Sequence, residues 1–302
     1  MFIREKYINP FTDFGFKKLF GTEPNKDLLI DFLNEVILPK PRKIVDLTYK
    51  KNEHLGASEF DRKAIFDLYC VGSNNERFIV EMQKAKQNYF KDRSVYYSTF
   101  PIQEQAVQGN WNYELSEVFT VGILDFVFAE TESETGEVRH VVHLKDQKDQ
   151  IFYDKLTFIY LEMPNFTKTE AELETTYDKW LYVLKNLPSL HKRPFLLQEK
   201  IFERLFETAE IAKFTREEKE QYEDSLKSYR DLKNVIDTSY DEGKLEGKLE
   251  GILEGEIKGK LEEKISGILK SLKRGKLTVE EIAEDFDTTI DVVMDLKKKE
   301  NL

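Results

Sequence analysis

The sequence predicts a mixed α/β core with a central sheet flanked by helices, followed by an all-helical C-terminal extension. Residues 24–38 carry apolar side chains at helical spacing, and short runs rich in β-branched and aromatic residues follow at 43–50, 64–71 and 77–83. From about residue 165 the pattern is helical to the end. The order of helix, three strands, helix and further strands is typical of a sheet covered by helices.

The remaining elements of the core are bounded by residues that interrupt regular structure. Pro39 ends the first helix, and a second helix is expected over 89–108, interrupted by Pro101. Further strands are expected at 117–130, 137–146 and 151–163. These elements place the core in residues 1–165, and its limit extends to about 235 if the following helices pack on it.

The composition indicates a soluble, folded protein without a membrane segment. The 302 residues are 40% hydrophobic, which is enough for a sizeable buried core. No apolar run approaches the ~18 residues of a membrane span, and residues 1–11 lack the apolar centre of a signal peptide. The single cysteine, Cys70, has no partner for an intrachain disulfide. We therefore expect a cytoplasmic protein with no membrane contact and with Cys70 in its core.

The formal net charge of −11 is unevenly distributed. Over residues 1–93, Lys and Arg outnumber Asp and Glu by three, so the acidity belongs to residues 94–302. Phosphate binding depends on Lys and Arg, and an acidic chain on its own argues against a nucleic-acid partner. The mild basic bias of the first part leaves room for a locally basic surface there.

A four-residue repeat dominates the helical extension, which we divide into 166–240, 241–270 and 271–302. Glycine recurs at 243, 247, 251, 255 and 259, and Leu or Ile recurs at 245, 249, 253, 257, 261 and 265. Glycine costs roughly 1 kcal/mol in a helix interior, so an isolated helix here is marginal. Two interpretations remain. One is a helix that docks on a partner or forms a homo-oligomer, and its most specific version is a helix–helix contact through the glycine stripe. The other is a flexible linker.

The tail has the outline of a helix-turn-helix. Helices are expected over Val279–Asp285 and Ile290–Lys297, with Thr288 as the cap of the second. In a recognition helix, Asp291 and Asp295 would repel phosphates. A small packing or interaction appendage is therefore favoured over a DNA-recognition element.

The residues with the clearest chemistry lie in the strands at 64–71 and 77–83. If these strands pair as an antiparallel hairpin, Asp67 and Glu81 are directly opposed when paired residue numbers sum to 148, which centres the turn on Asn74. An odd-numbered loop satisfies this condition, and Asn tolerates the left-handed conformations that such loops need. A two-residue loop without a bulge would place the two carboxylates on opposite faces of the sheet.

Asp67 and Glu81, once opposed, have Cβ atoms about 5 Å apart and repel each other unless a cation lies between them. Mg²⁺ binds one or two carboxylates together with water and phosphate oxygens, and it activates a bound water for attack on phosphorus. Asp67 and Glu81 are therefore candidate ligands of a divalent metal. Gln83 shares a face with Glu81 and can orient the attacking water, although an amide accepts no proton. The alternative is a pair of surface carboxylates on a solvated sheet face.

These motifs resemble the PD-(D/E)XK nuclease core, in which a strand Asp, a hairpin and Glu-x-(Lys or Gln) follow an amphipathic helix. More specifically, the chain resembles the Rpn family of recombination-promoting nucleases, which are also described as transposase-like. The resemblance covers essentially the whole chain and rests on these segments: DFGFKKLFG at 13–21, FDLYC at 66–70, FIVEMQ at 78–83, YFKDRSVYYSTF at 89–100, and the repeats with the small tail.

The resemblance implies a restriction-endonuclease-like fold and metal-dependent hydrolysis of DNA in recombination, mobile-element or phage-defence contexts. It places Asp67, Glu81 and Gln83 on catalytic positions. It also implies Asp67, Glu81 and the backbone carbonyl of Met82 as ligands of Mg²⁺, which Mn²⁺ can replace. Gln83 departs from the Lys of the wider superfamily and leaves open how water is activated. Lys84 is adjacent but points to the other face, so it is not assigned that role.

Two other functions remain open at this stage. The first is a catalytically weak DNA-binding or regulatory protein on a nuclease-like scaffold, because Gln83 cannot act as a base. The second is transposition proper, with joining of DNA strands as well as cutting.

The first motif also contains candidates for DNA contact. Lys17 and Lys18 either contact DNA phosphates or are ordinary solvated lysines of a helix. Asp13 is either a helix cap or a further acid near the metal, and the cap is favoured.

The second predicted helix adds Arg93 to the candidates. Tyr89, Arg93 and Tyr97 share one helix face at i, i+4 and i+8. Arg93 either neutralises a phosphate or pairs with a carboxylate of the core, and the carboxylate is favoured. Tyr97 is an accessory candidate on the same face.

Overall fold

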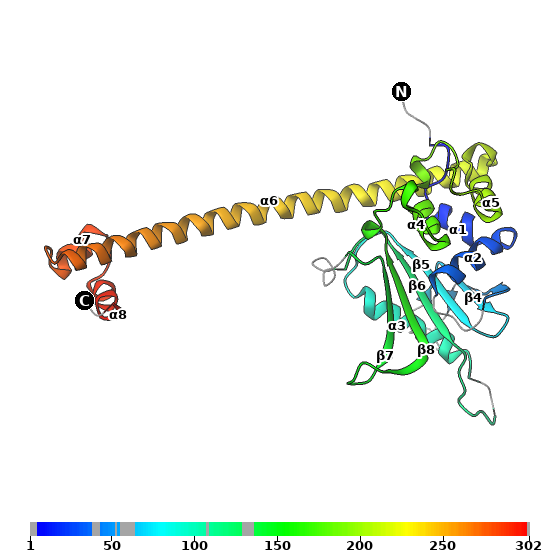
Figure 1. Ribbon diagram of the computed structural model, residues 1–302, viewed down its shortest axis with the longest axis horizontal. Coiled ribbons are helices and arrows are strands. Elements are labelled where there is room, and N and C mark those ends of the chain that lie inside the picture. The colour runs from blue at the N-terminus through cyan, green and yellow to red at the C-terminus, as the bar shows by residue number, and fades with distance from the viewer. Residues whose placement is uncertain are drawn as a thin grey trace. The chain divides into compact units, whose positions relative to one another are not determined.

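The computed structural model describes residues 5–37, 43–51, 53–54, 64–106, 109–128 and 136–300 (Figure 1). The chain divides into two compact units, Met1–Lys233 and Asn234–Leu302. Each unit is considered by itself below. The boundaries predicted from the sequence at 165, 240 and 270 stay predictions.

The first unit is built on a mixed six-stranded sheet in the order β1-β4-β5-β6-β8-β7. Its strands are β1 (Leu47–Tyr49), β4 (Leu68–Gly72), β5 (Arg77–Gln83), β6 (Val118–Leu124), β7 (Arg139–Lys145) and β8 (Ile151–Glu162). The central strands β5, β6 and β8 are parallel, and β1, β4 and β7 pair antiparallel with their neighbours. A separate antiparallel pair joins β2 (Glu53–His54) to β3 (Ala64–Ile65). The predicted mixed sheet is confirmed.

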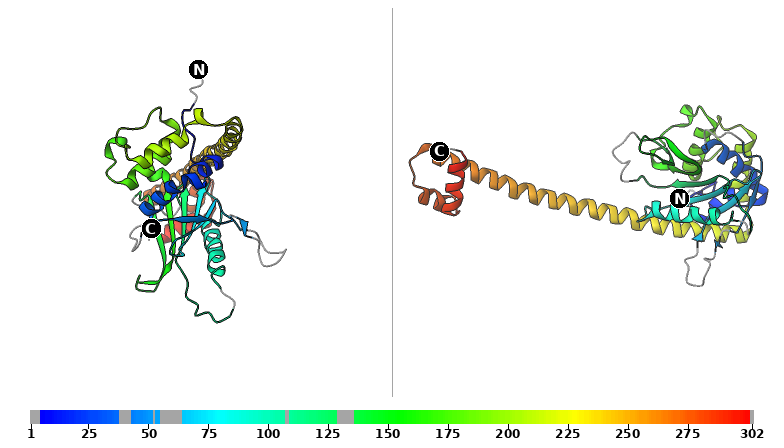
Figure 2. Two further views of the ribbon diagram at one scale, coloured as in Figure 1. Left: turned by 90° about the vertical axis from the view of Figure 1, so that its right-hand side faces the viewer. Right: turned by 90° about the horizontal axis from the view of Figure 1, so that it is seen from below.

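Helices cover both faces of this sheet (Figures 1 and 2). They are α1 (Asp13–Phe20), α2 (Lys26–Val36), α3 (Phe90–Gln103), α4 (Thr176–Asn186), α5 (Lys200–Ala209) and the start of α6 (Arg216–Arg274). Short 3-10 turns lie at Glu23–Asn25, Met163–Asn165, Glu170–Glu172, Leu187–Ser189 and Ile211–Lys213. The main core packs α1, α2, α4 and α5 on one face of the sheet, and α3 packs on the other.

Alternation along β5 decides which side chains reach which layer. Phe78, Val80 and Met82 join the main core, whereas Ile79 packs toward α3. Glu81 and Gln83 follow Ile79 by steps of two residues, so they share its face. The catalytic candidates of β5 therefore lie under α3.

Trp180 of α4 is the centre of the aromatic packing in the main core. Its ring is fully buried and lies 5.3–5.8 Å from those of Phe20, Phe32 and Phe202. The indole N–H donates a 2.7 Å hydrogen bond to Asp31, which satisfies the one polar atom of the ring. This cluster holds α1 and α2 against the second half of the first unit.

Four predicted elements require correction. The strand predicted over 117–130 is confined to Val118–Leu124. The run 64–71 is not one strand but two, β3 and β4, because the chain bends at Phe66–Asp67. The helix predicted over 89–108 begins at Phe90 and ends at Gln103, with Pro101 in its last turn, and residues 107–108 lie outside the described part. The strand predicted over 43–50 is confined to Leu47–Tyr49.

The second unit contains the rest of α6, α7 (Val279–Asp285) and α8 (Ile290–Lys299). Ile268, Ile282, Ala283 and Val293 form a small buried core between these three helices. Thr278 and Glu281 form a capping box at the start of α7. Thr289, not Thr288, occupies the N-cap position of α8, and its side chain makes no capping hydrogen bond, whereas the Thr288 N–H still bonds to the Ala283 carbonyl. These contacts favour the packing appendage predicted for the tail.

None of the described helices is long and apolar enough to cross a membrane. Even α6, with 59 residues, carries charged side chains along its whole length.

Gly15 should be essential for the packing of α1. A Cβ atom at this position would lie 2.1 Å from the carbonyl oxygen of Asn9 and 2.7 Å from the hydroxyl of Thr12. We expect Gly15→Ala to lower the free energy of unfolding by about 2 kcal/mol, because backbone must move to relieve the contact. Urea denaturation followed by tryptophan fluorescence measures the change. Lys17→Ala, an exposed change in the same helix, is the control and should shift the free energy by less than about 0.5 kcal/mol.

Candidate active site

The turn between β4 and β5 sets the geometry of the site. Leu68, Tyr69 and Cys70 pair with Val80, Ile79 and Phe78, so paired residue numbers sum to 148 as predicted. Asn75 adopts φ +68°, the left-handed conformation expected for an Asn in this loop. The buried carboxylate of Glu76 accepts hydrogen bonds from the backbone and side-chain nitrogens of Asn74. The predicted register and turn are confirmed.

Asp67 lies at the bend that precedes β4. Its Oδ2 accepts a 2.8 Å hydrogen bond from the backbone N–H of Met82, which ties it to the strand that carries Glu81. The preceding residue, Phe66, packs its ring against Tyr69 and Tyr97. Phe66 therefore turns toward α3, and this breaks the simple alternation that a single continuous strand would give.

Glu81 is buried, with 8% of its surface exposed. Its carboxylate lies 3.7 Å from a guanidinium nitrogen of Arg93 on α3. Burial and the nearby charge of Asp67 raise the pKa of Glu81 to about 7, and Arg93 opposes that rise. Burial also raises the pKa of Asp67, whereas the Met82 N–H favours its ionised form. The structure thus holds a buried Glu81 and a partly buried Asp67, and the charge of Asp67 disfavours the ionised form of Glu81.

The amide of Gln83 is held in one orientation. Its nitrogen donates to the carbonyl of Ala85 at 3.1 Å, and its oxygen accepts from Arg93 at 2.5 Å. A carbonyl oxygen has a second lone pair, so Gln83 retains one acceptor position for a water molecule.

Arg93 connects Glu81 and Gln83 to α3. Its guanidinium also donates to the side chain of Gln87 at 2.5 Å and lies over the rings of Phe90 and Tyr97. Within the described part of the chain, the buried Nε of Arg93 has no hydrogen-bond partner. The core-carboxylate contact predicted for Arg93 is present, and Tyr97 supports the guanidinium through its ring.

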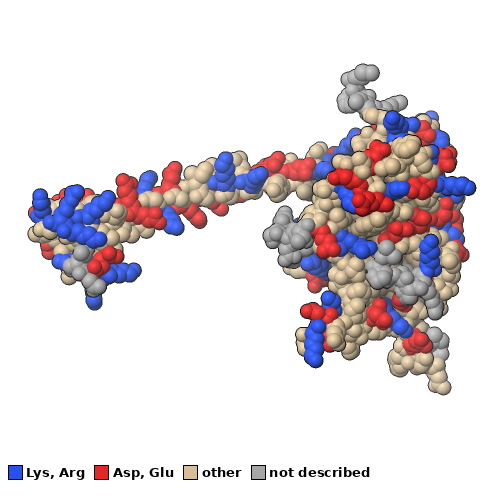
Figure 3. Space-filling view, in the orientation of Figure 1, with Lys and Arg blue, Asp and Glu red and all other residues tan. Residues whose placement is uncertain are grey.

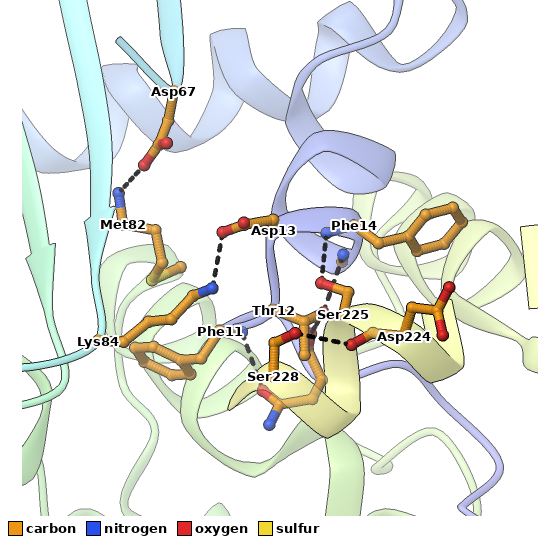
Figure 4. Close-up of polar contacts among 12 residues, drawn as sticks. Phe11, Thr12, Asp13, Phe14, Asp67, Met82, Lys84, Asp224, Ser225 and Ser228 are labelled. Atoms are coloured by element: carbon orange, nitrogen blue, oxygen red, sulfur yellow. Dashed lines mark hydrogen bonds and ion pairs between the residues drawn. The ribbon is translucent and has the colours of Figure 1, made fainter. Parts of the chain in front are cut away.

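A second polar group approaches the site from α1 (Figure 4). Lys84 follows the end of β5, and its ammonium bonds to Asp13 Oδ1 at 2.6 Å. Lys84 and Lys17 both lower the pKa of Asp67, whereas Asp13 raises it, so all three charges lie close to that carboxylate. Sequence reasoning placed Lys84 on the face opposite Glu81 and gave it no role. Its partner is 71 residues away in the sequence, and no local signal pointed to it.

Asp13 is not the cap of α1. Thr12 occupies the N-cap position, and its hydroxyl accepts the N–H of Gly15 at 3.0 Å. Thr12 is fully buried at the start of the helix. The Asp13 side chain is 70% exposed and turns toward Lys84. Asp13 is therefore available as the further acid that was the alternative to a cap.

The start of α6 fixes α1 in place (Figure 4). The Phe14 N–H donates to Ser225 at 3.1 Å, and the Asn9 N–H donates to the hydroxyl of Tyr222 at 2.9 Å. Lys18 forms an ion pair with Glu218 and lies over the ring of Phe214. Lys18 is thus engaged in packing, whereas the neighbouring Lys17 is exposed.

The site suits a divalent metal by its donor chemistry. Asp67 and Glu81 offer hard carboxylate oxygens, and their mutual repulsion is relieved by a cation. No group of three or more His, Cys, Asp or Glu side chains that could hold a metal occurs among the described residues. Mg²⁺ needs only one or two carboxylates when water and phosphate complete its shell, so the pair fits that ion.

Without metal, Glu81 should make stability depend on pH. Its pKa is raised from 4.5 to about 7 on folding, so between these values the unfolded chain loses the proton first. The free energy of unfolding of the parent should therefore fall by about 3 kcal/mol from pH 4.5 to pH 7 relative to Glu81→Gln. Urea titrations in EDTA measure the difference. Parallel curves for the two proteins would contradict the prediction, and the exposed Glu114→Gln should run parallel to the parent.

Comparison with known proteins places these features in one family. A family model described as PD-(D/E)XK nuclease family transposase matches residues 10–239, which include every candidate site residue described above. No curated protein and no solved structure matches the chain. The match covers more than half of the chain and agrees with the mixed sheet flanked by helices. The chain therefore belongs to the PD-(D/E)XK nuclease family transposases.

Proposed function

We propose that the protein is a metal-dependent DNA endonuclease that hydrolyses phosphodiester bonds in recombination, mobile-element or phage-defence contexts. The single observation that carries the proposal is the pair of carboxyl groups of Asp67 and Glu81, which the β4–β5 hairpin and the Asp67 bond to the Met82 N–H bring close together. The family match supports nuclease chemistry, and DNA is the substrate implied for a nuclease of this family.

Asp67, Glu81 and the backbone carbonyl of Met82 are the proposed ligands of Mg²⁺, with Mn²⁺ as a substitute. The bound ion would lower the pKa of water and neutralise charge on the scissile phosphate. The Met82 N–H orients Asp67, and Arg93 opposes the burial cost of Glu81. Gln83 offers its free acceptor position to the attacking water, so it positions that water without taking its proton.

Arg93 and Lys17 are proposed phosphate contacts. The partly exposed guanidinium of Arg93 places positive charge beside Glu81, and Lys17 is exposed near Asp67. Lys18 remains a weaker candidate because Glu218 already pairs with it. Over the face drawn in Figure 3, acidic and basic side chains are interspersed across the first unit, so steering by a single broad basic surface is not part of the proposal.

Plasmid DNA incubated with the protein and Mg²⁺ or Mn²⁺ should become nicked or linear. Asp67→Asn and Glu81→Gln keep the size of each side chain and should each lower the rate by at least about 100-fold, because each removes a metal ligand. Agarose gels measure the rate, and EDTA should abolish it. Asp92→Asn, an exposed change on α3, is the control. Equal cleavage by parent and both variants would reject the site.

The runner-up function is a catalytically weak DNA-binding or regulatory protein on the same scaffold. Gln83 favours it, because an amide accepts no proton. Titration calorimetry distinguishes the two. DNA binding that is equal with and without divalent metal, together with no measurable metal binding by the protein, would favour the regulatory function. Strand joining needs its own assay with marked DNA ends.

We also propose that Lys84 supplies positive charge beside Asp67 that Gln83 cannot supply. Lys84→Met should lower kcat roughly 100-fold and change KM less, because charge stabilisation is required mainly in the transition state. The exchanged pair Asp13→Lys with Lys84→Asp separates this role from a structural one. The exchange should restore thermal stability, since the ion pair is rebuilt, without restoring kcat. Recovery of both would assign the pair to structure alone.

A further inference from the structure

The repeat in α6 presents a continuous apolar stripe. Within the second unit, Leu245, Leu249, Leu253, Ile257 and Leu261 are 60%, 59%, 59%, 61% and 55% exposed. Single exposed leucines are ordinary, but an unbroken row of five apolar side chains along one helix is typical of a surface that packs on another helix.

The stripe and the glycines lie on different sides of α6. Each glycine is two residues from a stripe residue, which is about 200° around a helix. A Cβ atom added at Gly243, Gly247, Gly251, Gly255 or Gly259 would meet nothing within 4 Å. Residues four apart form one of the ridges by which helices interlock. When two helices pack through such ridges, their axes cross at about −50°. The stripe therefore suits a crossing of two helices better than a long left-handed coiled coil.

Charge borders the stripe with opposite sign on its two sides. The residue before each stripe position is Lys244, Lys248, Ile252, Glu256 and Lys260 in turn. The residue after each position is Glu246, Glu250, Glu254, Lys258 and Glu262. At Ile257 both signs are reversed together, so the two borders stay opposite there as well. Figure 3 shows side chains of both signs along this helix.

We propose that the stripe packs against the same stripe of a second copy of this chain, with the two helices parallel. In a parallel pair, the border before the stripe on one helix faces the border after the stripe on the other. Lys248 then faces the second copy's Glu250, and Lys244 faces the second copy's Glu246. At the reversed repeat, Glu256 faces the second copy's Lys258, which is again an attractive pair.

The antiparallel arrangement fits the charges less well. There, each border faces itself, so Lys248 faces a second Lys248 when the helices cross at Leu249. A crossing at Ile257 opposes two copies of Glu256 in the same way. A crossing at Leu253 sets Lys248 against Glu256 and Glu250 against Lys258, but it also opposes two copies of Glu254. The parallel pair sets opposite charges together at Leu245, Leu249, Ile257 and Leu261, and at Leu253 it sets the uncharged Ile252 against Glu254.

The charge order is not explained by the helix alone. Within α6, Glu242, Glu246, Glu250 and Glu254 follow one another at i, i+4, as do Lys244 and Lys248. Like charges at this spacing destabilise an isolated helix. Over residues 242–254 this arrangement is unfavourable within one chain and favourable between two parallel copies, whereas Glu254 and Glu256 are each followed at i, i+4 by a lysine.

The full-length protein should sediment as a dimer. Leu249→Asp with Ile257→Asp should make it a monomer with unchanged helix content by circular dichroism, since both side chains are exposed. Gly247→Ala with Gly251→Ala is the matched control on the other side of the helix and should leave the dimer intact. A monomeric parent would overturn the proposal. It would also be overturned if the glycine variant became a monomer while the Leu249→Asp, Ile257→Asp variant stayed a dimer.

Cysteine cross-linking tests the orientation, because the only native cysteine, Cys70, is buried. Parallel helices should cross-link two copies of Leu249→Cys, and two copies of Ile257→Cys, under mild oxidation. An antiparallel crossing at Leu253 would instead link Leu249→Cys only to Ile257→Cys in a mixture, and that result would overturn the parallel arrangement.

Charge reversal provides an independent arm of the same test. Lys248→Glu should raise the dissociation constant roughly tenfold, because the introduced carboxylate opposes the second copy's Glu250 twice per dimer. Adding Glu250→Lys should restore the parent value. Within one helix, Lys248→Glu turns the like-charge pair with Lys244 into an opposite-charge pair, and Glu250→Lys does the same with Glu246. Neither change therefore weakens the helix itself, so a weaker dimer with the single variant would come from the contact between copies. No loss with the single variant would overturn the proposed facing of the borders.

Discussion

The antiparallel register of β4 and β5 is the constraint on which the rest of the site depends. The turn from Gly72 to Glu76 fixes this register. The Gly72 N–H donates a hydrogen bond to the Glu76 carbonyl, and Asn75 adopts a left-handed backbone conformation. A shift by one residue would send Glu81 and Gln83 to the other face of the sheet, away from Arg93. The buried carboxylate of Glu76 therefore has a geometric role: its bonds to the turn hold the pairing of the two strands that position the acidic pair.

Two helices bring charged side chains to the end of β5 from opposite sides of the sheet. From one face, Arg93 of α3 reaches Glu81 and Gln83. From the other, Asp13 of α1 holds Lys84 close to Asp67. Since alternate residues of a strand point to opposite faces, adjacent residues at the end of β5 serve both sides at once. In place of the single lysine of the wider superfamily, this site therefore has Arg93 beside Glu81 and both Lys84 and Lys17 close to Asp67.

The odd-numbered loop and the strand register of the hairpin could be predicted from the sequence, because they depend only on local spacing and on an Asn suited to the turn. The mixed sheet could be predicted too, since strand periodicity is a local signal as well. The bend at Phe66–Asp67 was missed because apolar residues on both sides continue the strand pattern, and the packing of Phe66 on Tyr97 overrides that pattern. The Lys84 contact with Asp13 depends on how α1 docks, which no short-range pattern encodes. The Thr12 cap is local, but Thr and Asp both cap helices, so the adjacent Thr12 and Asp13 were both eligible.

The helix α6 combines two roles whose residues are separate in the sequence. Its first turns hold α1 through Ser225 and Tyr222, so they belong to the support of Asp13 and the candidate site. Its repeat leaves apolar side chains exposed beside borders of opposite charge, which are of no use to a single chain. Cutting both strands of a duplex takes two hydrolyses, and a single site acts on one phosphodiester at a time. Pairing through the repeat would give one assembly two candidate sites, which offers a physical reason for a nuclease to keep an otherwise unfavourable helix.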